Sequence, residues 1–587
     1  MTTKTLILEV LQKTLKELYD LELPEKTKVE RPKEEAHGDL STNLAFLLAK
    51  DLKKPPVKVA EELAQKLSED RRFKRVEAIK GFINFHFSRE FLIEETKKIL
   101  LLGEEYFKED LGKGLKVQVE FVSANPTGPL HLGHGRGAVV GDTIARLLKF
   151  FGYDVVREYY INDAGRQVYL LGLSILYRYL EDCPERDEEF FKSIQETFNE
   201  DGYRGEYVKE LAQKLRELIG DKLCRPQEAN LTMLQREILE KGRSLPLYYT
   251  QKYAPKDAVE LAANFGLDLM LEEIKRDLEV MNVEFDVWYS ERSLYDKGLV
   301  EELINLLKEK GYIYEKDGAL WLRTSEFGDE KDRVVRRSDG TYTYFASDIA
   351  YHYEKFKRGF QKVVNVWGAD HHGYIPRVKA SLKMLGIPED WLEVFLVQMV
   401  KLFREGVEVR MSKRAGNFVT LRELLDEVGQ DAVRFIFLTK RSDTPLDFDL
   451  DKAKEKSSEN PVFYVQYAHA RIAGILREFK QRYQREVSLE ELASYLKHLS
   501  EEVEEKLMKK LVMFKDELIE ITQRGEPHLL TYYLIDLASQ FHNYYNHHRI
   551  LGMKEEVMYS RLALIVAVQK VIRLGLSLMG VSAPERM

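Results

Sequence analysis

The stretch SANPTGPLHLGHGRG, residues 123–137, constrains this chain more than any other part of its sequence. It holds two prolines and four glycines between the alternating run LKVQVEFV and the apolar run AVVGDTIARLLKFFG. The alternation predicts a strand, and the second run predicts a helix that ends at Gly152. Glycine lets a backbone approach a ligand closely. The order therefore predicts a strand, a ligand-binding loop and a helix N-terminus.

A helix N-terminus placed after a strand suits an anion, because its first N–H groups are unpaired and its dipole favours negative charge. His131 and His134 are three residues apart and supply donors for phosphate oxygens, while Gly133, Gly135 and Gly137 give the backbone room. DVVREYYI follows as a second strand, so the whole segment predicts a right-handed parallel βαβ unit.

Three other interpretations of the loop remain open. Gly133 and Gly135 with Ala138 match a loose dinucleotide fingerprint, as in an NAD-dependent oxidoreductase, although SANPTGPLHL separates them from the strand. The H-x-x-H spacing together with DHH at 370–372 is a candidate metal site. The two histidines also fit a packed glycine-rich turn without a ligand.

Composition limits the classes of protein that this chain can be. Its 587 residues predict about three to five domains. The net charge of −8 gives no general basic field, so an RNA site must be a local patch. Cys183 and Cys224 lack C-x-x-C spacing, so we expect no protein-bound zinc, no disulfide framework and a reducing compartment. LALIVAV at 562–568 is too short to span a bilayer, so we expect no membrane association.

Changes of pattern along the chain predict four parts. These are a small α+β domain over 1–105, an α/β domain over 115–400 with a helical insertion at about 165–275, a connecting region over 401–455 and a helical domain over 456–587. FDVWYS, ALWLRT and VVNVWGAD predict further strands of the α/β domain. In the first part, Asp39 or Ser41 is expected to cap a helix.

The histidine motif and a second motif together resemble class I aminoacyl-tRNA synthetases. P-x-H-x-G-H, opening a helix after a strand, resembles their H-I-G-H signature. VRMSKRAGN at 409–417 resembles their K-M-S-K-S loop, with Arg410 and Arg414 in place of the first lysine and the last serine and with Lys413 retained. The motifs stand in the expected order, about 280 residues apart.

Further phrases resemble arginyl-tRNA synthetases: VEFVSANPTGPLHLGH, SDGTYTYFASDIAYH, VWGADHHGY, NPVFYVQYAHAR, GVSAPERM and the N-terminal HGDLSTNLAF. The resemblance covers essentially the whole chain. It implies a multidomain α/β fold, in which a Rossmann-type parallel-sheet catalytic core lies between a tRNA-contacting N-terminal domain and an all-helical anticodon-binding domain.

The same resemblance implies an arginine–tRNA ligase that uses ATP to make arginyl-adenylate and then transfers arginine to the terminal adenosine of tRNA(Arg). It implies Mg²⁺ held mainly by the phosphates, activation that depends on tRNA, and a cytoplasmic monomer. A class I synthetase for another amino acid remains the alternative.

A guanidinium is held best by carboxylates that accept paired hydrogen bonds. Tyr344 and Asp348 are four residues apart and share one face of a predicted helix, so the resemblance places them on the guanidinium. Glu291 is expected near the same group or the amino group. Glu120, Ser123 and Asn125 are expected at the α-amino and carboxylate ends, and the complete expected arginine set is Glu120, Ser123, Asn125, Glu291, Tyr344, Asp348 and Asp370.

The remaining expected site residues fall into three groups. Catalysis is assigned to His131, His134 and Lys413. The expected ATP contacts are Pro129, His131, Gly133, His134, Gly135, Arg410, Met411, Ser412 and Lys413. Aromatic and basic residues interleave in the helical domain, as RNA recognition requires, and the tRNA contacts expected there are Tyr464, Tyr467, Arg471 and Tyr544.

Overall fold

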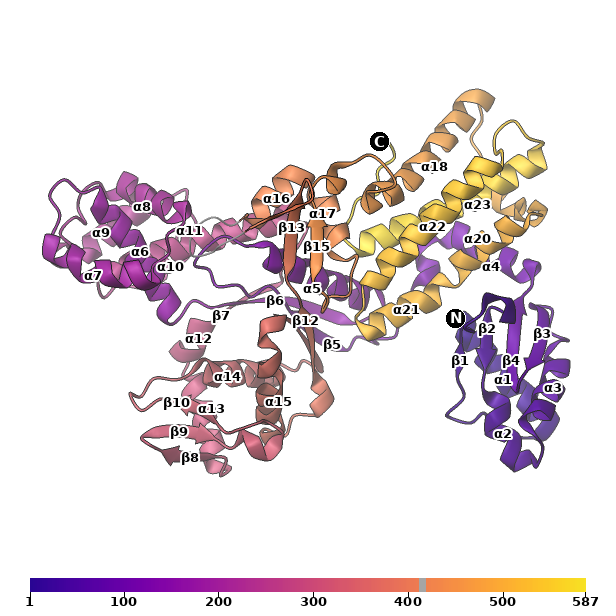
Figure 1. Cartoon of the computed structure of the whole chain (residues 1–587), viewed down its shortest axis with the longest axis horizontal. Helices are drawn as coiled ribbons and strands as arrows, with labels where there is room; N and C mark the ends of the chain where they lie inside the picture. The colour runs from indigo at the N-terminus through magenta and orange to yellow at the C-terminus, as the bar shows by residue number, and fades with distance from the viewer. Residues whose placement is uncertain (411–418) are drawn as a thin grey trace. The chain divides into compact units, whose positions relative to one another are not determined.

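A computed structural model describes residues 1–410 and 419–587 of the chain and divides them into two compact units. The terminal unit combines residues 1–111 with 456–587, and the central unit spans 112–455. Figure 1 shows the elements of both. Within the described residues, no helix combines the length and the apolar character that crossing a membrane requires.

The central unit is built on a sheet of five parallel strands in the order β12-β11-β5-β6-β7. Their bounds are β5 Lys116–Glu120, β6 Asp154–Ile161, β7 Val287–Ser290, β11 Lys362–Gly368 and β12 Leu392–Val397. The strands expected at LKVQVEFV, DVVREYYI, FDVWYS and VVNVWGAD are therefore confirmed. The strand order reverses between β5 and β11, and ligands bind outside the carboxyl ends of strands at such a point.

Helix α5 (Leu132–Phe150) follows β5 and packs against β6 and β11. Gly141 permits its close approach to the sheet, since a Cβ there would lie 2.2 Å from Cγ of Phe121. Helices α14 (Tyr344–Lys357) and α15 (Ile375–Met384) pack against each other before and after β11. The two short helices that follow β7 are α12 (Glu291–Asp296) and α13 (Leu299–Glu309).

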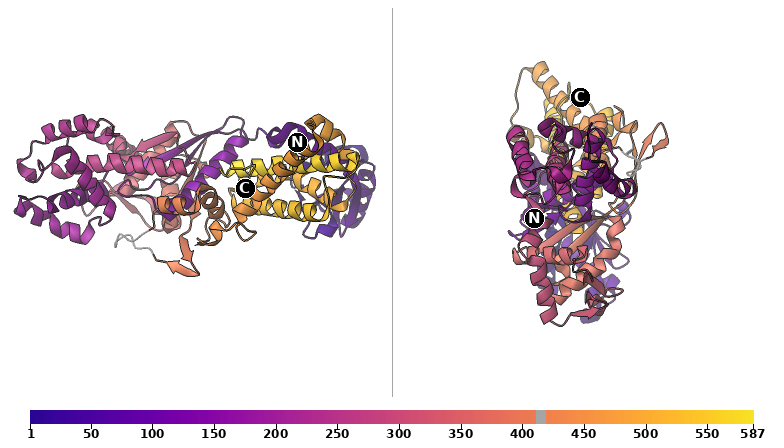
Figure 2. Two further views of the ribbon diagram at one scale, coloured as in Figure 1. Left: turned by 90° about the horizontal axis from the view of Figure 1, so that it is seen from above. Right: turned by 90° about the vertical axis from the view of Figure 1, so that its left-hand side faces the viewer.

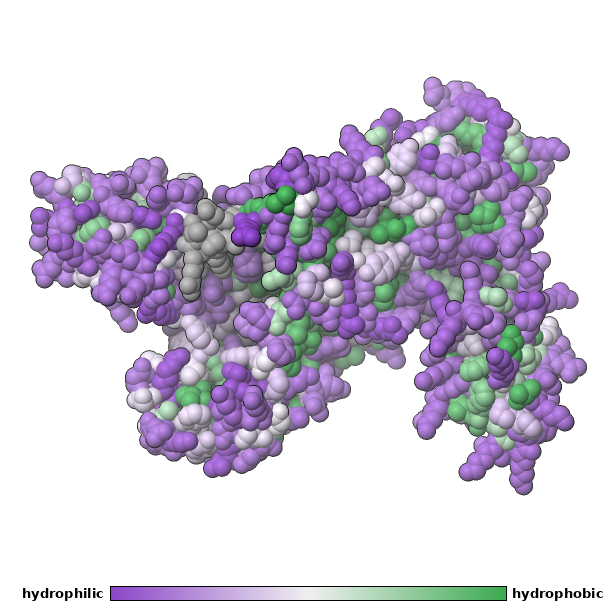
Figure 3. All heavy atoms as spheres, in the orientation of Figure 1, coloured by the Kyte–Doolittle hydropathy of each residue, from purple (hydrophilic) through white to green (hydrophobic). Residues whose placement is uncertain are grey.

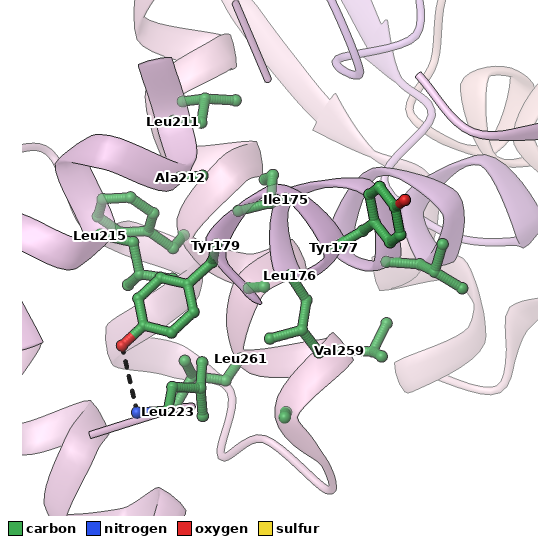
Figure 4. Packing of buried hydrophobic residues seen from close by; sticks show 14 of the residues in the cluster. Ile175, Leu176, Tyr177, Tyr179, Leu211, Ala212, Leu215, Leu223, Val259 and Leu261 are labelled. Carbon is green, nitrogen blue, oxygen red and sulfur yellow. Dashed lines mark hydrogen bonds between the residues drawn. The ribbon is translucent and has the colours of Figure 1, made fainter. Parts of the chain in front are cut away.

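Every regular element between β6 and β7 is a helix. These are α6 Arg166–Glu181, α7 Glu188–Asp201, α8 Glu206–Ile219, α9 Leu231–Lys241, α10 Tyr248–Lys252 and α11 Ala258–Val280. They enclose a core of their own, in which Leu215 of α8 lies beside Tyr179 of α6 (Figure 4). The amide of Leu223 donates to the Tyr179 hydroxyl at 3.2 Å.

Cys183 and Cys224 form a disulfide in this helical insertion, with their Cα atoms 5.8 Å apart. The sequence led us to expect no disulfide as an organising element, and this pairing corrects that expectation. The two cysteines are separated by 41 positions, so only the packing of the insertion brings them together.

ALWLRT is a strand but does not belong to the parallel sheet. It forms β9 (Ala319–Leu322), which pairs antiparallel with β8 (Ile313–Lys316) and β10 (Arg333–Arg336) in a separate three-stranded sheet. The sequence placed it wrongly because alternation predicts a strand without predicting its partner.

After β12 the chain forms a third sheet in the order β14-β13-β15. It comprises β13 Val400–Arg404, β14 Val407–Val409 and β15 Leu446–Asp449, with α16 Leu421–Val428 and α17 Gln430–Phe437 between β14 and β15. The side chain of Thr420 accepts from the amide of Glu423 and so caps α16.

The N-terminal part of the terminal unit is an antiparallel sheet in the order β1-β2-β4-β3 with helices. Its elements are α1 Thr3–Tyr19, β1 Val29–Glu30, β2 Leu40–Thr42, α2 Leu44–Leu52, α3 Pro56–Leu67, β3 Phe73–Ile79, β4 Phe82–Phe87 and α4 Arg89–Leu102. The expected helix cap at Asp39 or Ser41 is wrong, because Ser41 lies in β2 and α2 begins three residues later. Asp39 instead accepts from the amide of Phe87 at 2.8 Å.

The C-terminal part of this unit is helical. It comprises α18 Pro461–Tyr483, α19 Leu489–Ser494, α20 Glu502–Val512, α21 Phe514–Arg524, α22 His528–His547 and α23 Glu555–Leu578. Helices α18, α22 and α23 run side by side, as Figures 1 and 2 show, and α4 packs against α19, α20 and α23. Hydrophilic residues cover most of the face drawn in Figure 3, with hydrophobic residues scattered among them.

Candidate active site

A cavity of about 1000 Å³ opens at the carboxyl ends of β5 and β11, where the strand order reverses. We call it the strand-end cavity. The expected site residues that line it are Glu120, Ser123, Asn125, His131, Gly133, His134, Tyr344, Asp348 and Asp370. Residues from β5, α5, α14 and the segment after β11 therefore meet in one place, although up to 250 positions separate them.

Several expected residues lie elsewhere. Pro129 lines a smaller adjoining cavity of about 220 Å³, which shares Asn125 and His134 with the first. Gly135 faces α16, since a Cβ there would lie 2.6 Å from Cδ1 of Leu421, so this glycine serves packing. Arg410 is the last residue before the gap in the described chain, and Met411, Ser412 and Lys413 lie outside the described residues.

His131 is the N-cap of α5, and its ring stacks on that of His134 with centroids 3.5 Å apart. Nδ1 of His131 accepts from the amide of Gly133 at 3.1 Å, and Nδ1 of His134 accepts from the amide of His131 at 3.2 Å. A neutral imidazole that accepts through Nδ1 carries its proton on Nε2. The capping contacts therefore fix both rings in the Nε2–H form at the wall of the cavity.

The chain returns to this histidine motif directly after the lysine-loop sequence. Thr420 forms a β-bridge with His131, and the amide of Leu421 donates to the carbonyl of Leu130 at 2.9 Å. These bonds connect the first described residues after the gap to the N-terminus of α5.

The backbone just after β5 is strained. Val122 and Ser123 have φ values of 67° and 43°, in the left-handed region that a β-branched residue rarely adopts. The Ser123 hydroxyl donates to Oε2 of Glu120 at 2.9 Å and accepts from the amide of Tyr160 at 3.1 Å. Asn162 donates to the carbonyl of Ser123 at 3.2 Å. This turn presents carbonyl, hydroxyl and carboxylate oxygens to the cavity.

A buried polar chain lies below Glu120. Lys355 donates to Oε1 of Glu120 at 2.7 Å and to Oδ1 of Asn365 at 3.1 Å. Nδ2 of Asn365 lies 2.8 Å from Nε2 of His352, and Nδ1 of His352 lies 2.7 Å from the carbonyl oxygen of Asp348. Burial and the charge of Lys355 lower the pKa of His352 to about 3, so its ring is neutral.

Of two neighbouring carboxyl groups, Asp348 lines the cavity, whereas Glu291, also expected at the site, is not among the residues that line it. Burial raises the pKa of Asp348 to about 7, although a hydrogen bond from the Tyr374 hydroxyl opposes the shift. Burial and the charges of Asp348 and Asp163 raise the pKa of Glu291 to about 8. Glu291 is 2% exposed, and within the described part of the chain its Oε2 has no hydrogen-bond partner. A buried and a half-buried carboxyl with raised pKa values are suited to a cation supplied from outside.

Two further cavity residues differ in exposure. Tyr344 is half exposed, and its hydroxyl donates to Oε1 of Gln167 at 2.6 Å. The Asp370 side chain is 82% exposed and lies near His371. No group of three or more histidine, cysteine or acidic side chains able to hold a metal occurs in residues 1–410 and 419–587.

The residues expected to bind tRNA lie in the terminal unit. Phe463, Tyr464, Tyr467, Arg471, His542 and Tyr545 form one cluster, which we call the α18–α22 aromatic face. The Arg471 guanidinium lies 4.4 Å from the centroid of Tyr545 and 5.2 Å from that of Tyr467. Tyr544 does not belong to it, because it is fully buried and donates to Glu504.

Sequence reasoning missed Gln167, Lys355, Asn365 and Tyr374. For Lys355 a signal existed, because Asp348, His352 and Lys355 have the i, i+4, i+7 spacing of one helix face. Gln167, Asn365 and Tyr374 come from other elements, and no spacing in the sequence relates them to Asp348.

Three family models match the chain. They are the arginyl tRNA synthetase N terminal domain over residues 5–87, the catalytic domain of class I (R) tRNA synthetases over 95–244 and 260–478, and the DALR anticodon binding domain over 465–587.

Known proteins agree with these matches. The arginine–tRNA ligase of Aquifex aeolicus is 74% identical over 584 residues, which cover 100% of both chains. That of Geobacillus thermodenitrificans is 46% identical, over 96% of this chain and 95% of its own. The structure of Thermus thermophilus arginyl-tRNA synthetase superposes with a TM-score of 0.72 at 24% identity, over 100% of both chains, and supports the fold.

Proposed function

The chain belongs to the class I arginyl-tRNA synthetases, and from this premise we propose how its strand-end cavity performs the reaction. It is an arginine–tRNA ligase, which uses ATP to activate arginine and then charges tRNA. The observation that carries the proposal is that both histidines of the α5 N-terminus and the carboxyls of Glu120 and Asp348 line one cavity.

Arginine lies with its guanidinium at Asp348 and Glu291. Glu291 is buried and Asp348 is half-buried, both have raised pKa values, and a guanidinium restores their charged form by pairing with them. Tyr344 borders the same space and Tyr374 orients Asp348. Lysine would leave part of the carboxylate surface unsatisfied, which gives discrimination without an editing site.

The α-amino and carboxylate groups of arginine lie at the strained turn after β5. Oε2 of Glu120 and the hydroxyl of Ser123 face this end together with Asn125. Asp370, an exposed residue of the cavity lining, completes the arginine set expected from the family.

ATP lies along the N-terminus of α5, with its α-phosphate close to the arginine carboxylate. The carboxylate oxygen attacks the α-phosphorus, and pyrophosphate leaves. The Nε2–H groups of His131 and His134 donate to phosphate oxygens as charge develops, and the dipole of α5 adds to this. Lys413, with Arg410, Met411 and Ser412 beside it, neutralises the leaving pyrophosphate. Mg²⁺ bound mainly by the phosphates of ATP would supply further charge neutralisation.

The terminal adenosine of tRNA(Arg) then attacks the adenylate through its 2′-hydroxyl. The α18–α22 aromatic face binds the anticodon region, since the exposed ring of Tyr467 next to a guanidinium suits unstacked bases. Tyr464, Tyr467 and Arg471 belong to that face. We place the enzyme in the cytoplasm as a monomer, as expected for this family.

Amino-acid-dependent exchange of labelled pyrophosphate into ATP tests the proposal. We expect exchange with arginine and with no other standard amino acid, and only when tRNA is present. Exchange with a different amino acid would contradict the assignment of Asp348 and Glu291 to a guanidinium. Exchange without tRNA would contradict the proposed coupling and leave the pocket intact.

A further inference from the structure

Lys355 is a charged side chain with no exposure to solvent. Its ammonium is 0% exposed, donates to Glu120 at 2.7 Å and to Asn365 at 3.1 Å, and lies 4.5 Å from the ring centroid of Tyr351. A buried ammonium is costly unless it is paired. The chain therefore retains this cation directly behind an expected substrate-binding carboxylate.

The groups that contact Lys355 leave Glu120 as the acidic partner of its ammonium. Oδ1 of Asn365 accepts from the ammonium, so the amide turns Nδ2 towards His352. His352 is neutral, because burial and Lys355 lower its pKa to about 3. Of the described residues that accept a hydrogen bond from Lys355, Glu120 is therefore the one with a negative charge.

Charge is therefore distributed unevenly along the cavity. At the end near β5, Glu120 and Lys355 sum to zero. Asp348, which also lines the cavity, and the nearby Glu291 form no ion pair within 4 Å with a cation of the described residues, and the charges of Glu120 and Lys355 shift the pKa of Asp348 in opposite directions. Free arginine has the same distribution, since its α-amino and α-carboxylate charges cancel and its guanidinium carries one positive charge.

We propose that Lys355 is a specificity-determining positioning residue, which neutralises Glu120 so that the end of the cavity near β5 accepts a zwitterion and rejects a second cation. The inference rests on the proposed placement of the α-amino group at Glu120. It explains how the enzyme orients a substrate with a cationic group at both ends, and how it excludes guanidinium amines that lack a carboxylate. Electrostatic complementarity of this kind acts on selectivity more than on affinity.

Agmatine is a suitable probe, because it has the amine and guanidinium of arginine without the carboxylate. The experiment measures the KM for arginine and the competitive Ki of agmatine during aminoacylation of tRNA. In Lys355→Met we expect the ratio of Ki to KM to fall by roughly tenfold or more, since an uncompensated charge in a part-buried site attracts a dication strongly. Lys355→Arg keeps the charge, and its ratio should stay near the wild-type value.

Two variants of Glu120 keep the proposal testable if Lys355→Met fails to fold. Glu120→Gln leaves Lys355 unopposed, so the ratio should rise. Glu120→Gln combined with Lys355→Met removes both charges and should return the ratio towards that of the wild type. If Lys355 has only a structural role, both constants rise together in Lys355→Met and the ratio is unchanged, which overturns the inference.

A control separates this inference from the proposed function. Asp348→Asn should weaken arginine and agmatine together, because both ligands carry the guanidinium. If Asp348→Asn changes neither constant, the placement of arginine is wrong. If it weakens both ligands while the Lys355 variants leave the ratio unchanged, the placement stands and the role of Lys355 is wrong.

Discussion

The strand-end cavity and the α18–α22 aromatic face contain the same three kinds of group in different surroundings. Each combines a histidine, a tyrosine ring and a cation: His352, Tyr351 and Lys355 in one, His542, Tyr467 and Arg471 in the other. In both, burial and the neighbouring cation lower the pKa of the histidine.

The two regions differ in how exposed the cation is and in which group it contacts. Lys355 is sealed from solvent and bonded to a carboxylate, whereas Arg471 is half-buried and covers the rings of Tyr467 and Tyr545. A sealed cluster fixes the position of one small substrate, and an open one offers flat rings on which a base can stack. We therefore expect mutations in the cavity to act on arginine and mutations on the aromatic face to act on tRNA.

The largest effect should come from Asp348→Asn. Removing this charge leaves the guanidinium with an incomplete partner in a buried site, so kcat/KM for arginine should fall by roughly a thousandfold. The KM for ATP should stay near the wild-type value. Steady-state aminoacylation measures both constants. Asp370→Asn is the matched control, because its side chain is exposed in the same cavity and its loss should matter far less.

His134→Asn should lower the rate of pyrophosphate exchange by about a hundredfold to a thousandfold, the usual loss of one transition-state donor. Asparagine can still accept from the amide of His131, so the helix cap is kept while the Nε2–H donor is lost. The KM for arginine should change little. A rise in that KM of the same size would mean that His134 acts on arginine instead of the phosphates.

The affinity for arginine should depend on pH, whereas the affinity for tRNA should not show the same pH dependence. The pKa values of Asp348 and Glu291 are raised to about 7 and about 8, so acid removes the charges that a guanidinium needs. Between pH 8 and pH 7 the KM for arginine should rise by up to about tenfold per pH unit, and below pH 7, where both carboxyls gain protons, it should rise more steeply. Isothermal titration in buffers of different ionisation enthalpy should detect proton release when arginine binds near pH 7.

The raised pKa values of Asp348 and Glu291 also determine at which pH bound arginine stabilises the protein more. A carboxyl whose pKa is raised by folding costs stability once the pH exceeds its unfolded pKa, and a bound guanidinium relieves that cost. Arginine should therefore raise the melting temperature more at pH 8 than at pH 6. An equal rise at both values would contradict the raised pKa values.

The smallest effect should come from Arg471→Ala. Loss of one guanidinium from a stacking surface should raise the KM for tRNA by about tenfold, with arginine and ATP unaffected. Tyr544→Phe is the matched control, since that ring is buried against Glu504 and should not alter the tRNA KM. If Arg471→Ala and Tyr544→Phe had the same effect on the KM for tRNA, the α18–α22 aromatic face would have only a structural role.

Much of the central sheet and of the site could be predicted from the sequence, because their signals are local. Alternation marked β5 and β6, and the glycine, proline and histidine spacing marked the start of α5. The positions of Tyr344 and Asp348 four residues apart marked one face of α14. Each signal depends on neighbours within one or two turns, where periodicity is informative.

Features that depend on contacts between residues far apart in the sequence were decided by the tertiary structure. The sequence determined that residues 319–322 form a strand, but packing decided that they join β8 and β10 instead of the parallel sheet. Packing likewise brought Cys183 to Cys224 and buried Tyr544. It also placed Lys355 against Glu120, 235 positions away, and so gave the cavity one neutral and one acidic end. The reason is physical: a residue type and its spacing fix which face of an element it occupies, whereas burial and charge pairing depend on what the rest of the chain places opposite that face.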